Sequence, residues 1–156
     1  MNAPSPRKSF VSIAIVGAAG VLAAGPALAD IKIGFNVPLT GFAAADGQSS
    51  LNGAKLAVAQ ANAAGGVNGE KIELVVYDDQ ASPKEAVPVA TKLVEKDKVV
   101  GAVSGSYSGS TRAAAGIFQA GKVPYVVAYA IHPDITRTGN YVFRVWARDY
   151  AGNISG

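Results

Sequence analysis

The chain has 156 residues, no cysteine, one histidine, and 14 basic against 11 acidic residues. The absence of cysteine excludes disulfides, thiolate metal sites and cysteine nucleophiles, and a lone His132 excludes a histidine-cluster metal site. Part of the positive charge lies at Arg7 and Lys8, so the rest of the chain is nearly neutral. Its net charge therefore gives no reason to expect a nucleic acid or an anionic membrane as a partner.

Residues 1–29 have the three-part layout of a secretory signal peptide. Arg7 and Lys8 precede an apolar run over residues 10–24, and Ala27-Leu-Ala29 fits the small-x-small rule for cleavage. The apolar run of ~15 residues is shorter than the ~20 that a transmembrane anchor needs. No cysteine follows it, which excludes a lipid anchor. We therefore expect export with cleavage after Ala29.

The first half of the mature chain alternates between strand and helix patterns. Residues 31–37 alternate apolar and polar side chains, which predicts a strand, and residues 38–47 are expected to form a loop. Residues 50–64 have helical spacing and end at Gly65-Gly66, and residues 72–77 predict a second strand.

The second half continues the alternation. Ser82 is a plausible N-cap for a helix with Pro83 in its first turn, ending near Lys98. The remaining elements are expected in this order: a buried strand over residues 99–103, a Ser/Gly loop over 104–111, a helix over 112–120, a buried strand over 123–128, an irregular segment over 130–139, and a last strand over 141–145.

This order predicts an α/β fold: a doubly wound, mostly parallel sheet with helices on both faces. In such sheets ligands bind beyond the carboxyl ends of the strands. Three loops are expected at that edge, over residues 38–47, 104–111 and 128–133.

Most motifs that resemble catalytic ones have a structural explanation. The run from Gly116 to Lys122 has P-loop spacing, but Val123 replaces the Ser or Thr, and a helix end precedes a strand there. The mature chain has no G-x-S-x-G elbow, and His132 beside a proline is expected in a loop. Asp78 and Asp79 follow a strand, where Asp commonly stabilises a turn, so a structural role outweighs an acid–base pair.

The loop over residues 104–111 is the strongest candidate for ligand contact. It carries five hydroxyls between a buried strand and a helix N-terminus, and ordinary N-capping needs only one. Free backbone N–H groups and the positive end of the helix dipole favour an anion there, such as a carboxylate.

Taken together, these segments resemble the periplasmic solute-binding proteins of branched-chain amino acid ABC transporters, a type 1 periplasmic binding fold. The similarity covers essentially the whole mature chain. Its motifs, in order, are Val37-Pro-Leu-Thr-Gly, Asn52-Gly-Ala-Lys-Leu-Ala, Ala61-Asn-Ala-Ala-Gly-Gly-Val-Asn-Gly, Tyr77-Asp-Asp-Gln, Ser82-Pro-Lys-Glu-Ala, Val123-Pro-Tyr, Pro133-Asp-Ile-Thr and Tyr141-Val-Phe-Arg.

The resemblance implies a set of ligand-binding residues and no metal or cofactor. Ser108 is implied as a hydroxyl donor with Tyr107 beside it, and Tyr129 and Ala130 as sources of main-chain groups. Ile131 stands where relatives usually have Thr or Ser, and Asp46 falls at the side-chain pocket. An acid there suits a plain aliphatic group poorly, which leaves an amino-acid relative, an amide or another small carboxylate as the solute.

The resemblance also implies the domain plan and partners. Residues 30–148 would form the N-terminal ligand-binding lobe, and residues 149–156 the truncated start of a second lobe that in relatives supplies an acid for the ammonium. The implied role is a non-catalytic, periplasmic protein that delivers solute to an inner-membrane ABC permease. Two alternatives remain: a ligand-sensing module of the same fold that feeds a receptor, and a secreted α/β hydrolase.

Overall fold

A computed structural model describes residues 31–145, and the expected signal peptide and second-lobe start lie outside these residues. The described strands form one parallel sheet in the order β2-β1-β3-β4-β5. The strands are β1 (Ile31–Val37), β2 (Ile72–Asp78), β3 (Gly101–Ser104), β4 (Tyr125–Val127) and β5 (Val142–Arg144). The helices are α1 (Ala44–Ala63), α2 (Pro83–Thr91) and α3 (Ser108–Ala120).

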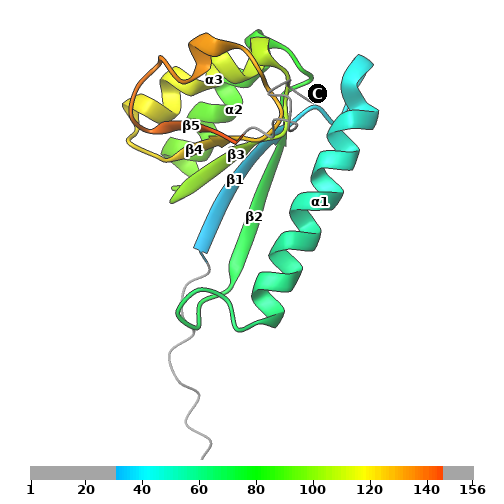
Figure 1. The fold of residues 1–156 in the computed structure, drawn as a ribbon, viewed down its shortest axis with the longest axis vertical. Helices are drawn as coiled ribbons and strands as arrows, with labels where there is room; N and C mark the ends of the chain where they lie inside the picture. The colour runs from blue at the N-terminus through cyan, green and yellow to red at the C-terminus, as the bar shows by residue number, and fades with distance from the viewer. Residues whose placement is uncertain (1–30, 146–156) are drawn as a thin grey trace, which may run out of the picture.

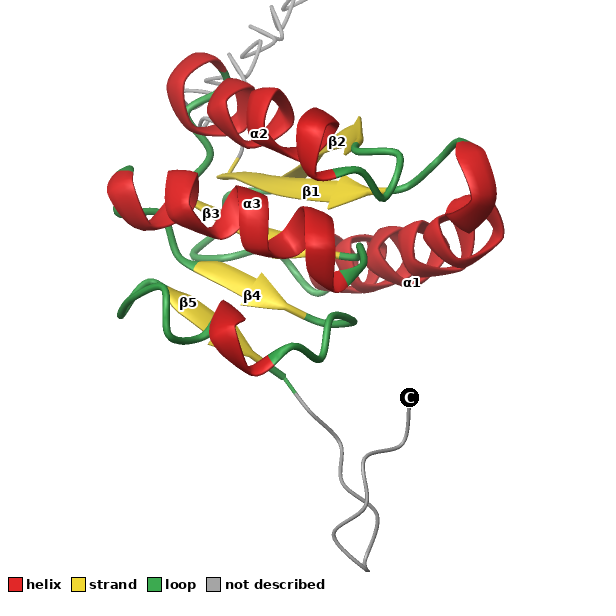
Figure 2. Ribbon diagram, turned by 90° about the horizontal axis from the view of Figure 1, so that it is seen from above, coloured by secondary structure: helices red, strands yellow, loops and turns green. Residues whose placement is uncertain are grey.

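Helices cover both faces of the sheet, which confirms the predicted fold class. Helices α2 and α3 lie together on one face, and α1 lies on the other, along β1 and β2 (Figures 1 and 2). None of the helices within residues 31–145 combines the length and the apolar character needed to cross a bilayer.

The two faces hold cores of different size. The core under α2 and α3 is the larger and includes Leu93, Phe118 and Tyr125. The rings of Phe118 and Tyr125 stack with their centroids 4.3 Å apart. The core under α1 consists of Phe35, Val37 and Leu51 with partly buried neighbours. Small residues fill the helix side of the larger core, so α2 and α3 approach the sheet and each other closely.

The first loop is shorter than the sequence predicts. A 3-10 turn at Gly41–Ala43 leads directly into α1, which begins at Ala44 rather than at Ser50. Two features explain the early start: alanine is the best helix former, and the carboxylate of Asp46 in the first turn is favourable to the helix dipole. The correction places Asp46 on a helix instead of in a loop.

Helix α3 also begins early, at Ser108 rather than at Arg112. The predicted Ser/Gly loop therefore shrinks to Gly105–Tyr107. Serine and threonine are poor helix formers because their hydroxyls compete for backbone groups, but here neighbouring side chains engage those hydroxyls. Strand β3 is displaced and strand β4 is shorter than predicted, by one or two residues at each end.

Helix α2 begins as predicted but ends differently. Ser82 has extended backbone and Pro83 follows at the first helical position, although the Ser82 side chain makes no capping bond. The helix then changes at Lys92–Lys96 into a π-helical turn, where the sequence suggests a continuous helix.

Gly65 and Gly66 have φ of 106° and 72° just beyond α1, as predicted for a glycine stop.

Candidate functional site

The predicted site residues come together at the carboxyl edge of the sheet. Tyr107 and Ser108 lie at the start of α3, directly after β3, and residues 129–131 follow β4. Asp46 lies in the first turn of α1, after β1. The parallel arrangement brings these three segments to one edge, because parallel strands have their carboxyl ends on the same side.

A buried polar network underlies this edge. Asn36 donates to Asp79 at 2.8 Å and accepts from the Tyr125 hydroxyl at 2.8 Å, and Ser106 donates to the other Asp79 oxygen at 2.9 Å. Asn36, Asp79 and Ser106 have no exposed surface. Burial raises the pKa of the Asp79 carboxyl, and the bonds from Asn36 and Ser106 oppose that rise only in part.

This network shows that most of the five hydroxyls in residues 104–111, which the sequence suggests for ligand contact, have a structural role instead. Four of them are buried and bonded within the protein: Ser106 pairs with Ser110, and Ser104 pairs with Thr111, both at 2.8 Å. They hold the turn that precedes α3 rather than facing a ligand. Of the five, only Ser108 reaches the surface of this edge.

The hydrogen bonds of Ser108 leave it one remaining role. Its Oγ accepts from the main-chain N–H of Ile131 and of His132, at 3.3 Å each. A hydroxyl has two acceptor sites and one hydrogen, so the capacity that remains at Ser108 is donation. The first N–H groups of α3 have no partner within the helix, and Tyr107 at the N-cap makes no side-chain bond to them. Donors therefore converge at this point.

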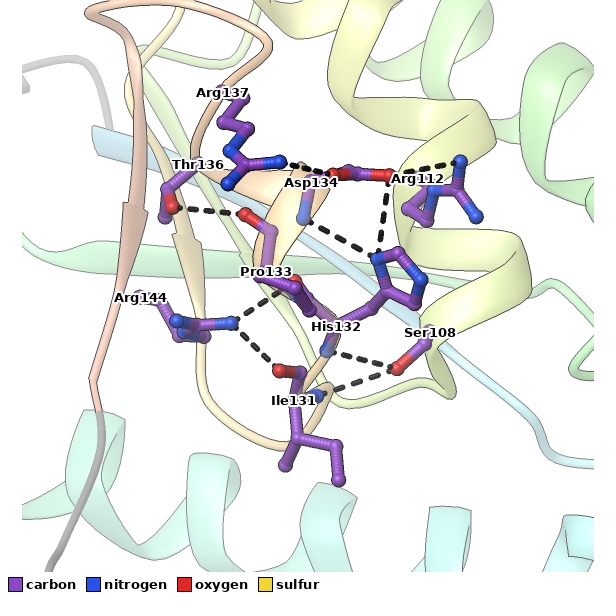
Figure 3. A network of polar contacts seen from close by, with 9 residues as sticks. All are labelled: Ser108, Arg112, Ile131, His132, Pro133, Asp134, Thr136, Arg137 and Arg144. Carbon is purple, nitrogen blue, oxygen red and sulfur yellow. Dashed lines mark hydrogen bonds and ion pairs between the residues drawn. The ribbon is translucent and has the colours of Figure 1, made fainter.

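Arg144 holds the same loop from the opposite side. Its Nη1 donates to the carbonyl of Ile131 at 2.7 Å and to the carbonyl of His132 at 2.9 Å. Figure 3 shows the two peptide groups held between Ser108 and Arg144, with the Ile131 side chain directed away from the network. The last strand, β5, thus positions the loop that follows β4.

We expect Arg144→Met to loosen this loop. Losing two bonds from a charged donor costs about 1.5 kcal/mol locally, which corresponds to roughly tenfold faster hydrogen exchange at the Ile131 and His132 amides. Arg144→Lys should restore protection only in part, because an ammonium lacks the planar fork of the guanidinium.

The matched control is Arg137→Met. The Arg137 side chain is 77% exposed, and its guanidinium bonds the carboxylate of Asp134 at 3.0 Å. This control should leave exchange at residues 131 and 132 unchanged. Equal exchange rates in wild type and Arg144→Met would contradict the positioning role.

The other part of the edge carries aromatic rings and one carboxylate. The Tyr107 hydroxyl donates to Asp46, and its ring packs edge-on to Tyr129 with centroids 5.2 Å apart. Phe42, which sequence reasoning overlooked, lies 5.6 Å from the Tyr107 ring and is 81% exposed. The bond to Asp46, followed by the contact with Tyr129, raises the pKa of Tyr107. The sequence signal that could have identified Phe42 is its place in the predicted ligand loop over residues 38–47.

Three predicted residues differ in how much of them a ligand could reach. Tyr129 and Ile131 are 45% and 50% exposed, whereas Ala130 is buried and its side chain belongs to the core under α3. An apolar hollow of about 270 Å³ opens beside Tyr129, between α1 and the sheet, and is lined also by Phe35, Ser50, Gly53, Ala54, Val103, Gly105 and Ala128.

His132 and Asp134 form a separate polar group beside Ser108. The His132 Nδ1 accepts from the Asp134 main-chain N–H at 3.2 Å, and Arg112 approaches the Asp134 carboxylate at 3.5 Å (Figure 3). Ser108 bonds the main chain of His132 rather than its ring. Asp78 accepts from the main-chain N–H of Gln80, two residues on, as predicted for an acid that stabilises the turn after its strand, and it also accepts from Leu39 and Thr40 after β1.

Comparison with known proteins identifies the family. The model of a family described as periplasmic binding protein matches residues 30–155. An amino acid binding protein of Pseudomonas aeruginosa is 38% identical over 144 residues, which are 92% of this chain and 38% of that protein. The chain thus spans less than two-fifths of the length of this relative.

Two solved structures share the fold. The branched-chain amino acid transporter substrate binding protein LivJ of Streptococcus pneumoniae, in complex with isoleucine, has a TM-score of 0.71 and 39% identity over 74% of this chain and 33% of its own. A solute binding protein of an ABC transporter from Rhodopseudomonas palustris BisB5, in complex with 3,4-dihydroxybenzoic acid, has a TM-score of 0.68 and 32% identity over 74% of this chain and 31% of its own. On the strength of the fold and the family match, this chain belongs to the periplasmic binding protein family.

Proposed function

We propose that this chain contributes to an extracytoplasmic solute-binding component of an ABC transporter and holds the carboxylate of a small amino-acid-like solute. The observation that carries the proposal is the donor geometry at Ser108, where two main-chain N–H groups occupy the acceptor sites of the hydroxyl. The inner-membrane permease and the periplasmic location follow from the family and belong to the same proposal.

The chemistry of the edge supports a carboxylate. Donors from Ser108 and the first turn of α3 converge where the positive end of the helix dipole lies, an arrangement suited to an anion. Arg112 and Arg144 lie near the same point and add positive charge. The two solutes named for the structural relatives, isoleucine and 3,4-dihydroxybenzoic acid, both carry a carboxylate.

The surroundings do not favour hydrolysis. A serine nucleophile needs a base within hydrogen-bond reach of its hydroxyl. The Ser108 Oγ instead accepts from backbone N–H groups, and the His132 ring nitrogen faces Asp134. The arrangement at Ser108 therefore serves binding rather than nucleophilic attack.

The test is an NMR titration with isoleucine and with isoleucinamide, which lacks the carboxylate. We expect Ser108→Ala to weaken isoleucine binding about tenfold, because a hydrogen bond to a charged group is worth about 1.5 kcal/mol. Isoleucinamide should bind weakly to both forms. A loop distortion would weaken both probes alike, so a selective loss for isoleucine identifies the carboxylate contact.

Ser49→Ala is the control, because Ser49 is an exposed serine on α1. It should bind isoleucine as the wild type does. Unchanged isoleucine affinity in Ser108→Ala, or equal binding of the two probes by wild type, would contradict the proposed carboxylate site.

A further inference from the structure

The candidate site has opposite electrostatic character on its two sides. On the α3 side, the donors at Ser108 lie near Arg112, Arg137 and Arg144, which outnumber the one acid there, Asp134, with which the first two pair. On the α1 side, Asp46 is the one charged residue between Lys32 and Lys55. A solute that spans the edge would meet donors at one end and an acceptor at the other.

The Asp46 carboxylate has capacity for a further partner. It is exposed at the start of α1, and within residues 31–145 its bonding partner is the Tyr107 hydroxyl, through one oxygen. The two other acids at this end of β1 and β2 are different: Asp78 accepts from the main chain of Leu39 and Gln80 and from Thr40, and Asp79 is buried and bonded to Asn36 and Ser106. Asp46 is therefore the acid available to a ligand on this side.

The rings beside Asp46 add a second preference for positive charge. Phe42, Tyr107 and Tyr129 form a continuous row, and the first and last keep large exposed surfaces. The face of an aromatic ring attracts cations, and in water it suits alkylated ammonium groups because these are weakly hydrated and cost little to desolvate. A phenol that donates to a carboxylate, as Tyr107 does, has a more electron-rich ring, which strengthens this attraction.

We infer that Asp46 and the aromatic row of Phe42, Tyr107 and Tyr129 form an ammonium-binding subsite for the positive end of the solute. The solute class is then a zwitterion, with its carboxylate at Ser108 and an amine or alkylated ammonium group at Asp46. This inference rests on the proposed function, since it assigns the second end of the same solute.

The subsite also accounts for Ile131. This residue has no hydroxyl to offer an ammonium, its N–H is used by Ser108, and its carbonyl is used by Arg144. A half-exposed isoleucine beside the aromatic row would instead contact the alkyl part of the solute. The positive end is thereby directed to the α1 side.

Tetramethylammonium chloride and its neutral isostere tert-butanol test the subsite in NMR titrations of the protein. We expect tetramethylammonium to shift the ring resonances of Phe42, Tyr107 and Tyr129, and tert-butanol to shift them much less. Asp46→Asn should weaken tetramethylammonium binding about fivefold, as expected for a partly exposed cation site. Glu73→Gln, which removes the same charge from an exposed position on β2, should leave it unchanged.

Equal shifts from the two probes, or unchanged tetramethylammonium binding in Asp46→Asn, would overturn the ammonium subsite. Sodium acetate separates this outcome from failure of the proposed function. Acetate should shift the amides of residues 108–110 in wild type and in Asp46→Asn alike. Acetate binding without tetramethylammonium binding overturns the subsite alone, and the reverse result contradicts the proposed carboxylate site alone.

Discussion

Asp79→Ala should lower the free energy of unfolding by about 3 kcal/mol, because removing one member of a buried charged network leaves its partners unpaired. The carboxylate accepts from Asn36, Ser106 and the main chain of Ala81. Since Asn36 also accepts from Tyr125, the loss extends from β1 to β4. Urea unfolding of both proteins measures the difference.

The control for Asp79→Ala is the same substitution at an acid on the protein surface. Glu73→Ala, on the surface of β2, should change the free energy of unfolding by less than about 0.5 kcal/mol. Similar losses from the two substitutions would mean that the buried network contributes nothing beyond general surface effects.

The same network predicts how stability depends on pH. Burial raises the pKa of Asp79 above its ordinary value of 3.8, so the folded protein retains a proton that the unfolded chain has lost. Its contribution to stability therefore falls as the pH rises from about 3.8 through the folded pKa, and is constant above it. Asp79→Asn should remove this fall, so the stability of the variant relative to wild type should increase with pH over that interval.

Asp78 provides a contrast of opposite sign. Burial opposes ionisation there, but the bonds from Thr40 and from the main chain of Leu39 and Gln80 prevail and lower its pKa. The folded state then favours the carboxylate, so this stabilisation is present above pH 3.8 and is lost as the pH falls through the folded pKa. Urea unfolding measures this effect: the stability of Asp78→Asn relative to wild type should decrease as the pH rises from the folded pKa to about 3.8.

Gly47→Ala should be among the most destabilising single substitutions, at about 3 kcal/mol, because it overpacks a backbone contact. Gly47 is buried in α1, and a Cβ at this position would lie 1.6 Å from the carbonyl oxygen of Pro38. No side chain can rotate to make room, so the start of α1 must move away from the end of β1. Asp46 would move with it and lose its bond from Tyr107.

Gly53→Ala is the matched control in the same helix. A Cβ at Gly53 meets nothing within 4 Å, and alanine is favoured over glycine in a helix interior by about 1 kcal/mol. Gly53→Ala should therefore stabilise the protein while Gly47→Ala destabilises it. Chemical unfolding and the Tyr107 ring resonances measure both effects, and equal outcomes for the two glycines would contradict the close contact at Pro38.

The sequence predicts the architecture well because its strand and helix patterns are local. The apolar alternation in residues 31–37, the Gly65-Gly66 stop and Pro83 at a helix start each reflect short-range backbone preferences, and the structure confirms them. Element ends were less predictable. The early start of α3 depends on the buried network beneath it, in which Ser110 bonds Ser106 and Ser106 bonds Asp79, 27 residues away.

The site shows the same division. The positions of Tyr107, Ser108, Tyr129 and Asp46 at one edge follow from strand order, which the sequence pattern supports. The individual contacts could not be predicted from the sequence pattern, because the partners lie far apart along the chain. Asp46 and Tyr107 are 61 residues apart, and Ile131 and Arg144 are 13 apart. Neither periodicity nor composition encodes which one of the five hydroxyls stays at the surface while the other four are buried.

By itself, then, the sequence determined the parallel α/β sheet and the edge at which ligand chemistry is found, because local periodicity and turn residues specify both. Only the tertiary structure decided what each polar residue does there. It assigned four hydroxyls to a buried network, left Ser108 with a hydrogen to donate, and placed Asp46 among aromatic rings. The physical reason is that a hydroxyl or carboxylate takes its role from the partners that folding brings within bonding distance.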